Sequence, residues 1–281
     1  MGFKMTTATD RYAVFGHPIK HSKSPQIHTL FAAQTAQQLC YEAIDVPPEQ
    51  FTQTLQTFFT EGGRGLNCTV PLKELAWEQM DQLSERARLA KAVNTIALND
   101  DASWFGDNTD GIGLVTDLTV NHAIPLQDER ILILGAGGAT RGILGPILEQ
   151  SPQSITIANR TPAKAEQLAQ EFNAIGAIRA CGLNELSGQS FNLIINATSA
   201  SLSGDLPPLP DNLLATQGCC YDLAYANDAT PFVTWGRQHH ALKSVDGLGM
   251  LVEQAAEAFF IWRKIRPDSK PVIDLLDAKR K

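Results

Sequence analysis

The stretch Ile131–Gly142, ILILGAGGATRG, decides the fold of this chain. Its aliphatic start predicts a buried strand, and Gly135, Gly137 and Gly138 predict a tight turn that leads into a helix. Such a turn lets the backbone approach a pyrophosphate, and the helix N-terminus supplies free N–H groups and the positive end of a dipole. Thr140 stands where the common G-x-G-x-x-G pattern has its third glycine. The stretch therefore predicts a dinucleotide-binding site of variant sequence.

The end of the next predicted strand selects the cofactor. Residues 154–158 predict that strand, which leads into Asn159, Arg160 and Thr161, with Lys164 one helical turn later. NAD-binding domains carry a carboxylate here, which hydrogen-bonds the adenosine ribose. This chain has no carboxylate at that position, and a guanidinium can pair with a 2′-phosphate and stack on adenine. We therefore predict NADP(H) rather than NAD as the cofactor.

Strand and helix signals alternate along most of the chain, which predicts an α/β protein with mostly parallel sheets. The predicted strands are 12–16, 41–46, 65–70, 94–98, 131–134, 154–158, 191–196 and 218–223. The predicted helices are 25–38, 47–61, 73–80, 84–90, the segment from the glycine turn to 150, 162–172 and 248–262. A Gly/Asp/Asn loop is expected at 106–111.

Composition restricts the partners. The 281 residues carry a net charge of −7, which gives no electrostatic reason to bind nucleic acid or an anionic membrane, so we expect neither partner. No secretory signal or run of about 20 apolar residues is present, and we predict a cytoplasmic protein that is a monomer or a homodimer. The cysteines form no C-x-x-C pair, so we expect reduced thiols and no metal site. Met1 and Met5 are both candidate natural starts.

Four polar motifs in the first part of the chain carry the substrate prediction. They are GHPIKHSKSPQIH (16–28), NCTVPLKE (67–74), AVNT (92–95) and GDNTDG (106–111). Each has an ordinary interpretation alone, since a serine at a helix entry is usually an N-cap and a lysine there is usually a surface charge. Together with GAGGA, NRT, NATS, YDLAY, TPF and DGLGMLVEQAA, they give a chain that resembles the shikimate dehydrogenase family over nearly its whole length.

The resemblance implies a two-domain fold with a cleft between the domains. We expect an N-terminal α/β substrate-binding domain at 1–109, completed by the C-terminal helices of 247–281. A Rossmann-like NADP-binding domain is expected at 110–246. The family reduces 3-dehydroshikimate to shikimate with NADPH, on the route to chorismate and the aromatic amino acids.

The resemblance also implies the residues that bind the substrate. The implied set is Ser22, Ser24, Thr69, Lys73, Asn94, Asp110, Tyr225 and Gln254. Within it, Ser22 and Ser24, helped by Tyr225, would bind the carboxylate, while Thr69, Asn94 and Gln254 would hold the ring hydroxyls. Lys73 and Asp110 would flank the reacting oxygen and act as the catalytic acid–base pair.

The implied cofactor contacts extend beyond the glycine turn. They are Glu85, Gly135, Ala136, Gly137, Gly138, Ala139, Asn159, Arg160, Thr161, Lys164, Thr198, Leu223 and Gly247. Asn196 and Ser199, which flank Thr198 after a predicted strand end, are further candidates for cofactor contact. The histidines His28, His239 and His240 have no companions typical of a metal site, so we interpret them as packing or surface residues.

Hydride transfer to a ketone creates an alkoxide, which needs charge stabilisation and a proton. We hypothesise that Lys73 polarises the carbonyl and donates that proton, and that Asp110 orients Lys73; the alternative is a structural salt bridge.

Three alternative functions remain open: a quinate/shikimate dehydrogenase using NAD or both cofactors, a catalytically silent NADP-binding paralogue, and a methylenetetrahydrofolate dehydrogenase-like enzyme. Arg160 disfavours an NAD-using quinate/shikimate dehydrogenase, and the presence of both Lys73 and Asp110 disfavours a silent paralogue. The HSKSP and GDNTDG segments disfavour a methylenetetrahydrofolate dehydrogenase-like enzyme.

Overall fold

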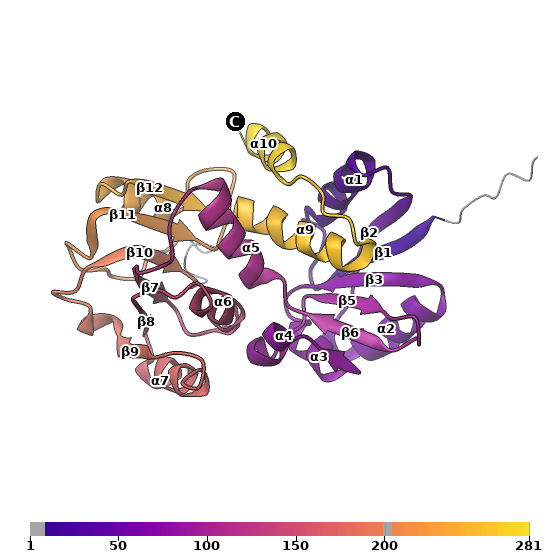
Figure 1. The fold of residues 1–281 in the computed structure, drawn as a ribbon, viewed down its shortest axis with the longest axis horizontal. Coiled ribbons are helices and arrows are strands. Elements are labelled where there is room, and N and C mark those ends of the chain that lie inside the picture. The colour runs from indigo at the N-terminus through magenta and orange to yellow at the C-terminus, as the bar shows by residue number, and fades with distance from the viewer. Residues whose placement is uncertain (1–8, 199, 201–203, 281) are drawn as a thin grey trace, which may run out of the picture. The chain divides into compact units, whose positions relative to one another are not determined.

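The computed structural model describes residues 9–198, 200 and 204–280. The candidate starts Met1 and Met5, and the candidate cofactor residue Ser199, lie outside the described residues. Contacts divide the chain into two compact units, which are Met1–Thr109 with Ala255–Val272, and Asp110–Gln254 with Ile273–Lys281. Each unit contains one six-stranded sheet among its described residues (Figure 1).

The first unit is built on a mixed sheet in the order β2-β1-β3-β5-β6-β4. Its strands are β1 (Asp10–Gly16), β2 (Leu39–Asp45), β3 (Gly63–Cys68), β4 (Gln82–Leu83), β5 (Thr95–Leu98) and β6 (Trp104–Asp107). Its helices are α1 (Ser24–Gln34), η1 (Pro48–Gln50), α2 (Phe51–Thr60), α3 (Lys73–Glu78) and α4 (Glu85–Ala90). Strand β1 pairs in parallel with β2 and β3, whereas β5 pairs antiparallel with both β3 and β6.

Both faces of this first sheet are covered, as the alternation along β1 requires. Ala13 and Phe15 point to the face where α2, α3 and α4 contribute their buried apolar side chains. Tyr12 and Val14 belong to a second apolar cluster, against which Trp262 packs. Helix α2 and helix α1 accordingly lie on opposite sides of the sheet in Figure 1.

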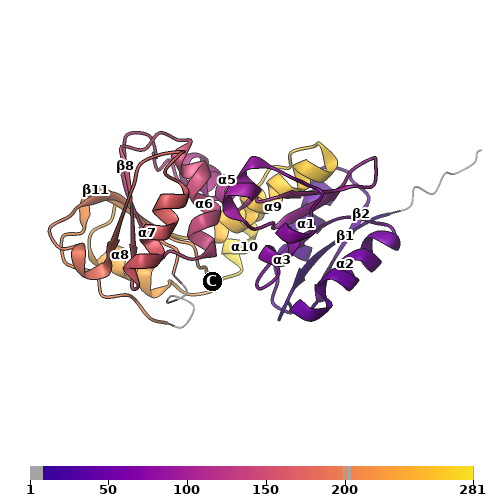
Figure 2. The same ribbon diagram turned by 90° about the horizontal axis from the view of Figure 1, so that it is seen from below.

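The second unit is built on a fully parallel sheet in the order β12-β11-β10-β7-β8-β9. Its strands are β7 (Arg130–Leu134), β8 (Ser154–Asn159), β9 (Ile178–Gly182), β10 (Phe191–Asn196), β11 (Leu214–Asp222) and β12 (Lys243–Asp246). Its helical segments are α5 (Asp110–Thr116), the π-helical turn η2 (Asp117–Asn121), α6 (Gly138–Leu148), α7 (Pro162–Glu171), η3 (Leu183–Glu185) and α8 (Pro231–Gln238) (Figure 2). Residues Ile131–Leu134 are completely buried, as expected for a parallel strand covered on both faces.

Two helices remain near the C-terminus. Residues 248–254 of α9 (Leu248–Arg263) belong to the second unit and residues 255–263 to the first, while α10 (Lys270–Ala278) begins in the first unit and ends in the second. Within the second unit, a Cβ on Gly249 would overlap the Asp117 carboxylate, and Arg280 forms an ion pair with Asp246 at 2.5 Å. This division differs from the predicted domains, which assigned all of 247–281 to the first, and the domain limits remain a prediction.

The predicted α/β class is confirmed. Segments β4, β6, β9, β12, α5, η2, η3, α8 and α10 were not predicted, and the missed strands have at most five residues. The expected loop at 106–111 is shorter than predicted, because Asp107 ends β6 and Asp110 begins α5. The buried side chains of residues 107–109, described below, explain why this polar segment is ordered.

The thiols of the described residues are all free, and four of them are buried. Burial raises the pKa of Cys68, and it raises the pKa of Cys220 to about 12. Since the thiolate is the reactive form, these two side chains act as small apolar residues. No described helix has the length and apolar character needed to cross a bilayer. The described part of the chain also has no cluster of three His, Cys, Asp or Glu residues suited to a metal ion.

Candidate active site

The glycine turn joins two strand ends of the second unit. Gly135 has a φ of +101°, and its N–H donates a 2.8 Å hydrogen bond to the carbonyl of Ala158 at the end of β8. A Cβ at Gly135 would lie 3.2 Å from the Ala197 carbonyl oxygen, so the backbone conformation favours glycine and the added atom would be tightly placed. A Cβ at Gly137 or Gly138 would meet nothing within 4 Å. The start of α6 therefore presents open backbone, which suits a phosphate.

Thr140 explains the departure from the usual glycine pattern. Its side chain is fully buried, and its Oγ1 donates a 2.8 Å hydrogen bond to the Gly135 carbonyl. The hydroxyl thus braces the turn from within the first turn of α6. This first turn contains no acidic residue that would repel an anion from the positive end of the helix.

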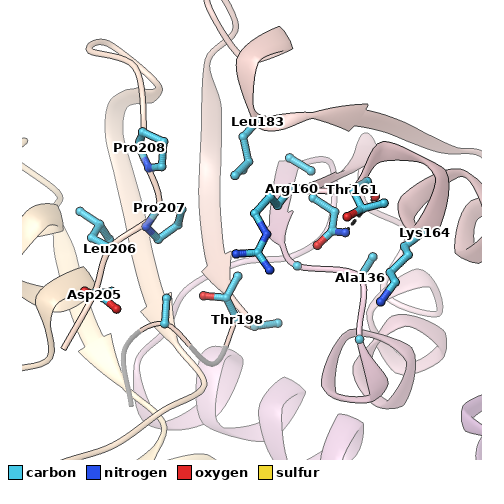
Figure 3. A pocket seen from close by; sticks show the side chains of 16 residues that line it. Ala136, Arg160, Thr161, Lys164, Leu183, Thr198, Asp205, Leu206, Pro207 and Pro208 are labelled. Atoms are coloured by element: carbon cyan, nitrogen blue, oxygen red, sulfur yellow. Dashed lines mark hydrogen bonds between the residues drawn. The ribbon is translucent and has the colours of Figure 1, made fainter. Parts of the chain in front are cut away.

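A pocket of about 560 Å³ opens beside this turn (Figure 3). The predicted cofactor residues that line it are Gly135, Ala136, Gly137, Asn159, Arg160, Thr161, Lys164 and Thr198. These residues come from the ends of β7, β8 and β10, which is the edge where open parallel sheets bind ligands. The predicted residues Gly138, Ala139, Leu223, Gly247 and Glu85 are not part of its lining.

Two cationic side chains dominate one side of the pocket. Arg160 extends toward Thr198, and Lys164 lies below Thr161 in Figure 3. Both are exposed, and neither side chain has a hydrogen-bond or ion-pair partner in the part of the chain that the structure describes. Asn159 shapes the loop that carries Arg160, because its Nδ2 donates to the Thr161 carbonyl at 2.9 Å, and Lys164 lies in the first turn of α7 that follows. Two unpaired cations, one in the loop and one at the start of the next helix, suit a doubly charged phosphate group.

The opposite wall of the pocket was missed by the sequence analysis. It consists of Leu183, Ala200, Asp205, Leu206, Pro207 and Pro208. Figure 3 shows Leu183 and the two prolines on the side of the pocket that faces Arg160. The signal that could have found this wall is the place of its residues after strand ends, Leu183 after β9 and the other five after β10, since the loops that follow strand ends form ligand sites in parallel sheets.

Asn196 supports the pocket from below. Its side chain is fully buried, its Oδ1 accepts a 2.7 Å hydrogen bond from the Thr198 hydroxyl, and its Nδ2 donates to Asp222 at 3.1 Å. Asp222 also accepts from Thr230, which caps α8. Asn196 therefore acts on the pocket through Thr198, and it does not line the pocket itself.

Leu223 and Gly247 lie together in the second unit. A Cβ on Gly247 would come within 2.3 Å of the Leu223 carbonyl oxygen, so only glycine allows this approach. Tyr225 follows shortly after, and burial raises its pKa, while the Arg280 guanidinium lies 6.0 Å from its ring centre. Gln254 donates from Nε2 to the Leu251 carbonyl at 2.7 Å. The predicted roles of these four groups in nicotinamide and substrate binding remain predictions.

In the first unit, neither serine of the loop before α1 occupies the N-cap position of that helix. Lys23 occupies the N-cap position of α1 without a side-chain hydrogen bond. Ser22 is half-buried and its Oγ accepts from the Ser24 N–H at 3.3 Å, while Ser24 itself is 8% exposed. The loop is anchored at Asp45, whose pKa is lowered by the hydrogen bond from His17. Ser22 therefore accepts a hydrogen bond from the first N–H of α1, although Lys23 occupies the N-cap position.

Asn94 lies in a buried polar network at the ends of the strands. It is 3% exposed, and its Oδ1 accepts from the Thr109 N–H at 2.9 Å, while its Nδ2 donates to the Thr109 hydroxyl at 3.0 Å. Asn67 donates to the Asn94 carbonyl and to Thr95, and Tyr41 donates to Asn67 at 2.7 Å. The predicted ring-hydroxyl ligand is thus held in one orientation by its neighbours.

The remaining predicted residues lie at element starts. Thr69 is half-buried after β3, and its N–H donates to the Phe15 carbonyl. Lys73 begins α3 and is half-buried, and Asp110 begins α5 in the second unit. Glu85 is an exposed residue at the start of α4 with an ion pair to Arg88 at 3.7 Å. The assignment of Glu85 to the cofactor stays a prediction.

Comparison with known proteins adds an independent observation. Three family models match this chain: Shikimate dehydrogenase substrate binding domain at residues 14–96, Shikimate / quinate 5-dehydrogenase at 118–203, and Shikimate 5′-dehydrogenase C-terminal domain at 247–276. The chain is 60% identical over 275 residues to the Shikimate dehydrogenase (NADP(+)) of Methylococcus capsulatus, which covers 98% of this chain and 99% of that relative.

Solved structures give the same pattern of similarity. An Ael1 enzyme from Pseudomonas putida is 47% identical with a TM-score of 0.90, covering 95% of this chain and 98% of that one. The Shikimate 5-Dehydrogenase of Thermus thermophilus, solved in complex with NADP(H) and shikimate, is 34% identical with a TM-score of 0.85. That match covers 97% of this chain and 100% of the other.

Proposed function

Because this chain belongs to the shikimate dehydrogenase family, we propose that it is an NADP-dependent oxidoreductase that interconverts 3-dehydroshikimate and shikimate. The observation that carries the cofactor assignment is the pocket beside Gly135, in which Arg160 and Lys164 have no protein partner among the described residues. The substrate assignment rests on the polar motifs of the first unit and on the 60% identical relative. The reaction belongs to the supply of chorismate for aromatic amino acids.

The residues of the pocket suit NADP(H) in size and charge. Open backbone at Gly137 leaves room for the pyrophosphate, and the N-terminus of α6 provides N–H donors for it. Arg160, with Lys164 beside it, would pair with the 2′-phosphate, and the guanidinium plane can also stack on adenine. When bound, NADPH supplies the hydride, and the chain's own groups provide orientation and the proton.

Lys73 is the residue that we assign to proton transfer. Its ammonium group would polarise the ketone and donate a proton to the oxygen during reduction, and its amine would accept that proton during oxidation. Asp110 would orient Lys73 and accept a hydrogen bond from the same substrate hydroxyl. A positioned acid–base group of this kind contributes about 10²- to 10⁴-fold to the rate.

The substrate carboxylate would bind to the hydroxyls of Ser22 and Ser24, with help from Tyr225. Both serines lie at the entry of α1 without occupying its N-cap position, and the hydroxyl proton of Ser22 can still be donated to a carboxylate. Thr69, Asn94 and Gln254 would contact the ring hydroxyls. The rigid network around Asn94 favours this role, because a fixed amide can distinguish the position of a hydroxyl.

A two-by-two assay tests the function directly. Purified protein is given NADP or NAD with shikimate or quinate, and cofactor reduction is followed by absorbance. We expect turnover mainly with NADP and shikimate. Preferred use of quinate or NAD would support the quinate/shikimate alternative, and no turnover in any combination would support a silent paralogue. A cytoplasmic location and the choice between monomer and homodimer stay predictions.

A further inference from the structure

A charged cluster in the first unit lies outside every role assigned so far. Its centre is Asp107, the last residue of β6, whose side chain is almost fully buried at 3% exposure. Arg86 on α4 binds this carboxylate through two hydrogen bonds, from Nε at 2.7 Å and from Nη2 at 2.6 Å. The Ser84 hydroxyl and the Asn108 N–H also donate to Asp107. The carboxylate is therefore held from three directions.

Arg86 connects this carboxylate to a distant part of the chain. Its Nη2 also donates to Glu257 on α9 at 2.9 Å, and Glu257 in turn binds Arg266. Burial lowers the pKa of Arg86, but hydrogen bonds and charges from Asp107 and Glu257 outweigh burial and raise it. A guanidinium between two carboxylates matches their geometry in a way that an ammonium does not.

The segment after Asp107 is fixed residue by residue. Asn108 donates from Nδ2 to the Ala92 carbonyl at 3.1 Å, and Thr109 exchanges hydrogen bonds with the Asn94 side chain. The Asn94 N–H donates to the carbonyl of Asp107 at 3.0 Å. Backbone and side chain of Asn94 are thus both set by this segment, and Asp110 is the next residue along the chain.

We propose that Arg86, braced by Glu257, is a positioning residue that holds Asp107 and through it the orientation of Asn94 and the chain leading to Asp110. This proposal rests on the proposed function, because Asn94 and Asp110 matter only if they meet the substrate. Arg86 itself touches neither substrate nor cofactor in this assignment. A shift of about 1 Å in a positioned group can lower a rate about 100-fold, so loosening this segment is expected to weaken turnover.

The test compares Arg86→Met with Arg263→Met. Arg263 on α9 is a matched control, because its side chain is 19% exposed and that of Arg86 is 22% exposed. It binds Asp10 and Gln37 rather than Asp107. Steady-state kinetics give KM for shikimate and for NADP separately, and the concentration of folded sites is counted by NADPH fluorescence titration. We expect Arg86→Met to lower kcat/KM for shikimate by about 10-fold or more, with KM for NADP within about 2-fold. Arg263→Met should lower Tm and leave kcat/KM for shikimate and KM for NADP unchanged.

Arg86→Lys keeps the charge but cannot make the two parallel hydrogen bonds, so it should restore only part of the activity. If Arg86→Met does not fold, Arg86→Lys takes its place in the kinetic comparison with Arg263→Met. Hydrogen exchange of the peptide spanning 104–112 is the second measurement, and exchange should become faster in both Arg86 variants but stay at the parent rate in Arg263→Met. Parental kcat/KM for shikimate in folded Arg86 variants, or equal losses in Arg263→Met, would overturn the proposal. An inactive parent protein would overturn the proposed function and the role of Arg86 together. An active parent with unchanged Arg86 variants would overturn only the role of Arg86.

Discussion

The two units build their sites in opposite ways. The pocket of the second unit is made of backbone at Gly135 and Gly137 and of exposed cations such as Arg160. The first unit instead places part of its candidate site in a buried network, in which Asn94 and Thr109 are held by each other. A ligand of the second unit meets groups that fold without it, whereas a ligand of the first meets groups that also stabilise the fold. Substitutions should therefore separate binding from stability in the second unit and couple them in the first.

The largest expected effect is on catalysis in the first unit. Lys73→Ala should lower kcat by at least about 100-fold, because it removes the proposed proton donor. Steady-state rates with shikimate and NADP measure this effect, and NADPH binding serves as the control for intact protein. A Lys73→Ala protein with near-normal kcat would contradict the assignment, and a raised KM alone would indicate a binding role.

The next effect separates binding from stability in the second unit. Arg160→Ala should raise KM for NADP by about 30-fold, in line with the loss of a charge-assisted hydrogen bond of about 2 kcal/mol. Tm should stay at the parent value, because Arg160 is exposed and has no protein partner in the described residues. KM for NAD should rise far less than KM for NADP, because NAD lacks the 2′-phosphate. Arg179→Ala is the matched control, since Arg179 is also exposed in this unit but does not line the pocket. An equal rise of KM for both cofactors would rule out selective 2′-phosphate binding.

A third effect concerns acid stability and belongs to the first unit. His28 is fully buried, stacks on Tyr41 at 4.2 Å, and has no hydrogen-bond partner for either ring nitrogen in the described chain. Burial lowers its pKa to about 3. The unfolded chain binds a proton near pH 6.5 and the folded chain does not, so stability falls as pH decreases from about 6.5 toward 3.

At pH 5.5 this difference amounts to about 1.4 kcal/mol per histidine. We expect His28→Phe to keep the packing and to lose about that much of the acid sensitivity. Urea unfolding at pH 7.5 and 5.5 measures it in both proteins. Identical pH dependence in parent and variant would show that other groups cause the acid loss.

The smallest effect compares two positions of one turn. Gly135→Ala should lower the free energy of unfolding by about 1 kcal/mol, because an alanine at φ +101° is strained and its Cβ approaches the Ala197 carbonyl. Gly137→Ala should change stability by less than about 0.5 kcal/mol, since nothing lies within 4 Å of its Cβ, yet it should weaken NADPH binding. Thermal unfolding measures the stability of each variant, and fluorescence titration measures its NADPH binding. Equal destabilisation of the two variants would contradict the open space at the Gly137 backbone.

Much of the second unit could be predicted because its signals are local. Aliphatic runs, the glycine turn and the residues after β8 all lie in short windows of sequence, and the predicted strand limits at β7, β8 and β10 agree closely with the structure. The elements that were missed, such as β6 and α5, depend on burial of a polar segment. Asp107 and Thr109 look like loop residues until their partners are known.

By itself, the sequence determined the α/β alternation, the position of Gly135 and the cationic end of β8, because backbone conformation and periodicity depend on near neighbours. Only the tertiary structure decided that Thr140 braces the turn, that Pro207 and its neighbours close the pocket, and that Arg86 joins Asp107 to Glu257. Arg86 and Glu257 are 171 residues apart in the chain, and such a contact appears in no local pattern. Burial and pairing of polar groups are decided when distant segments meet.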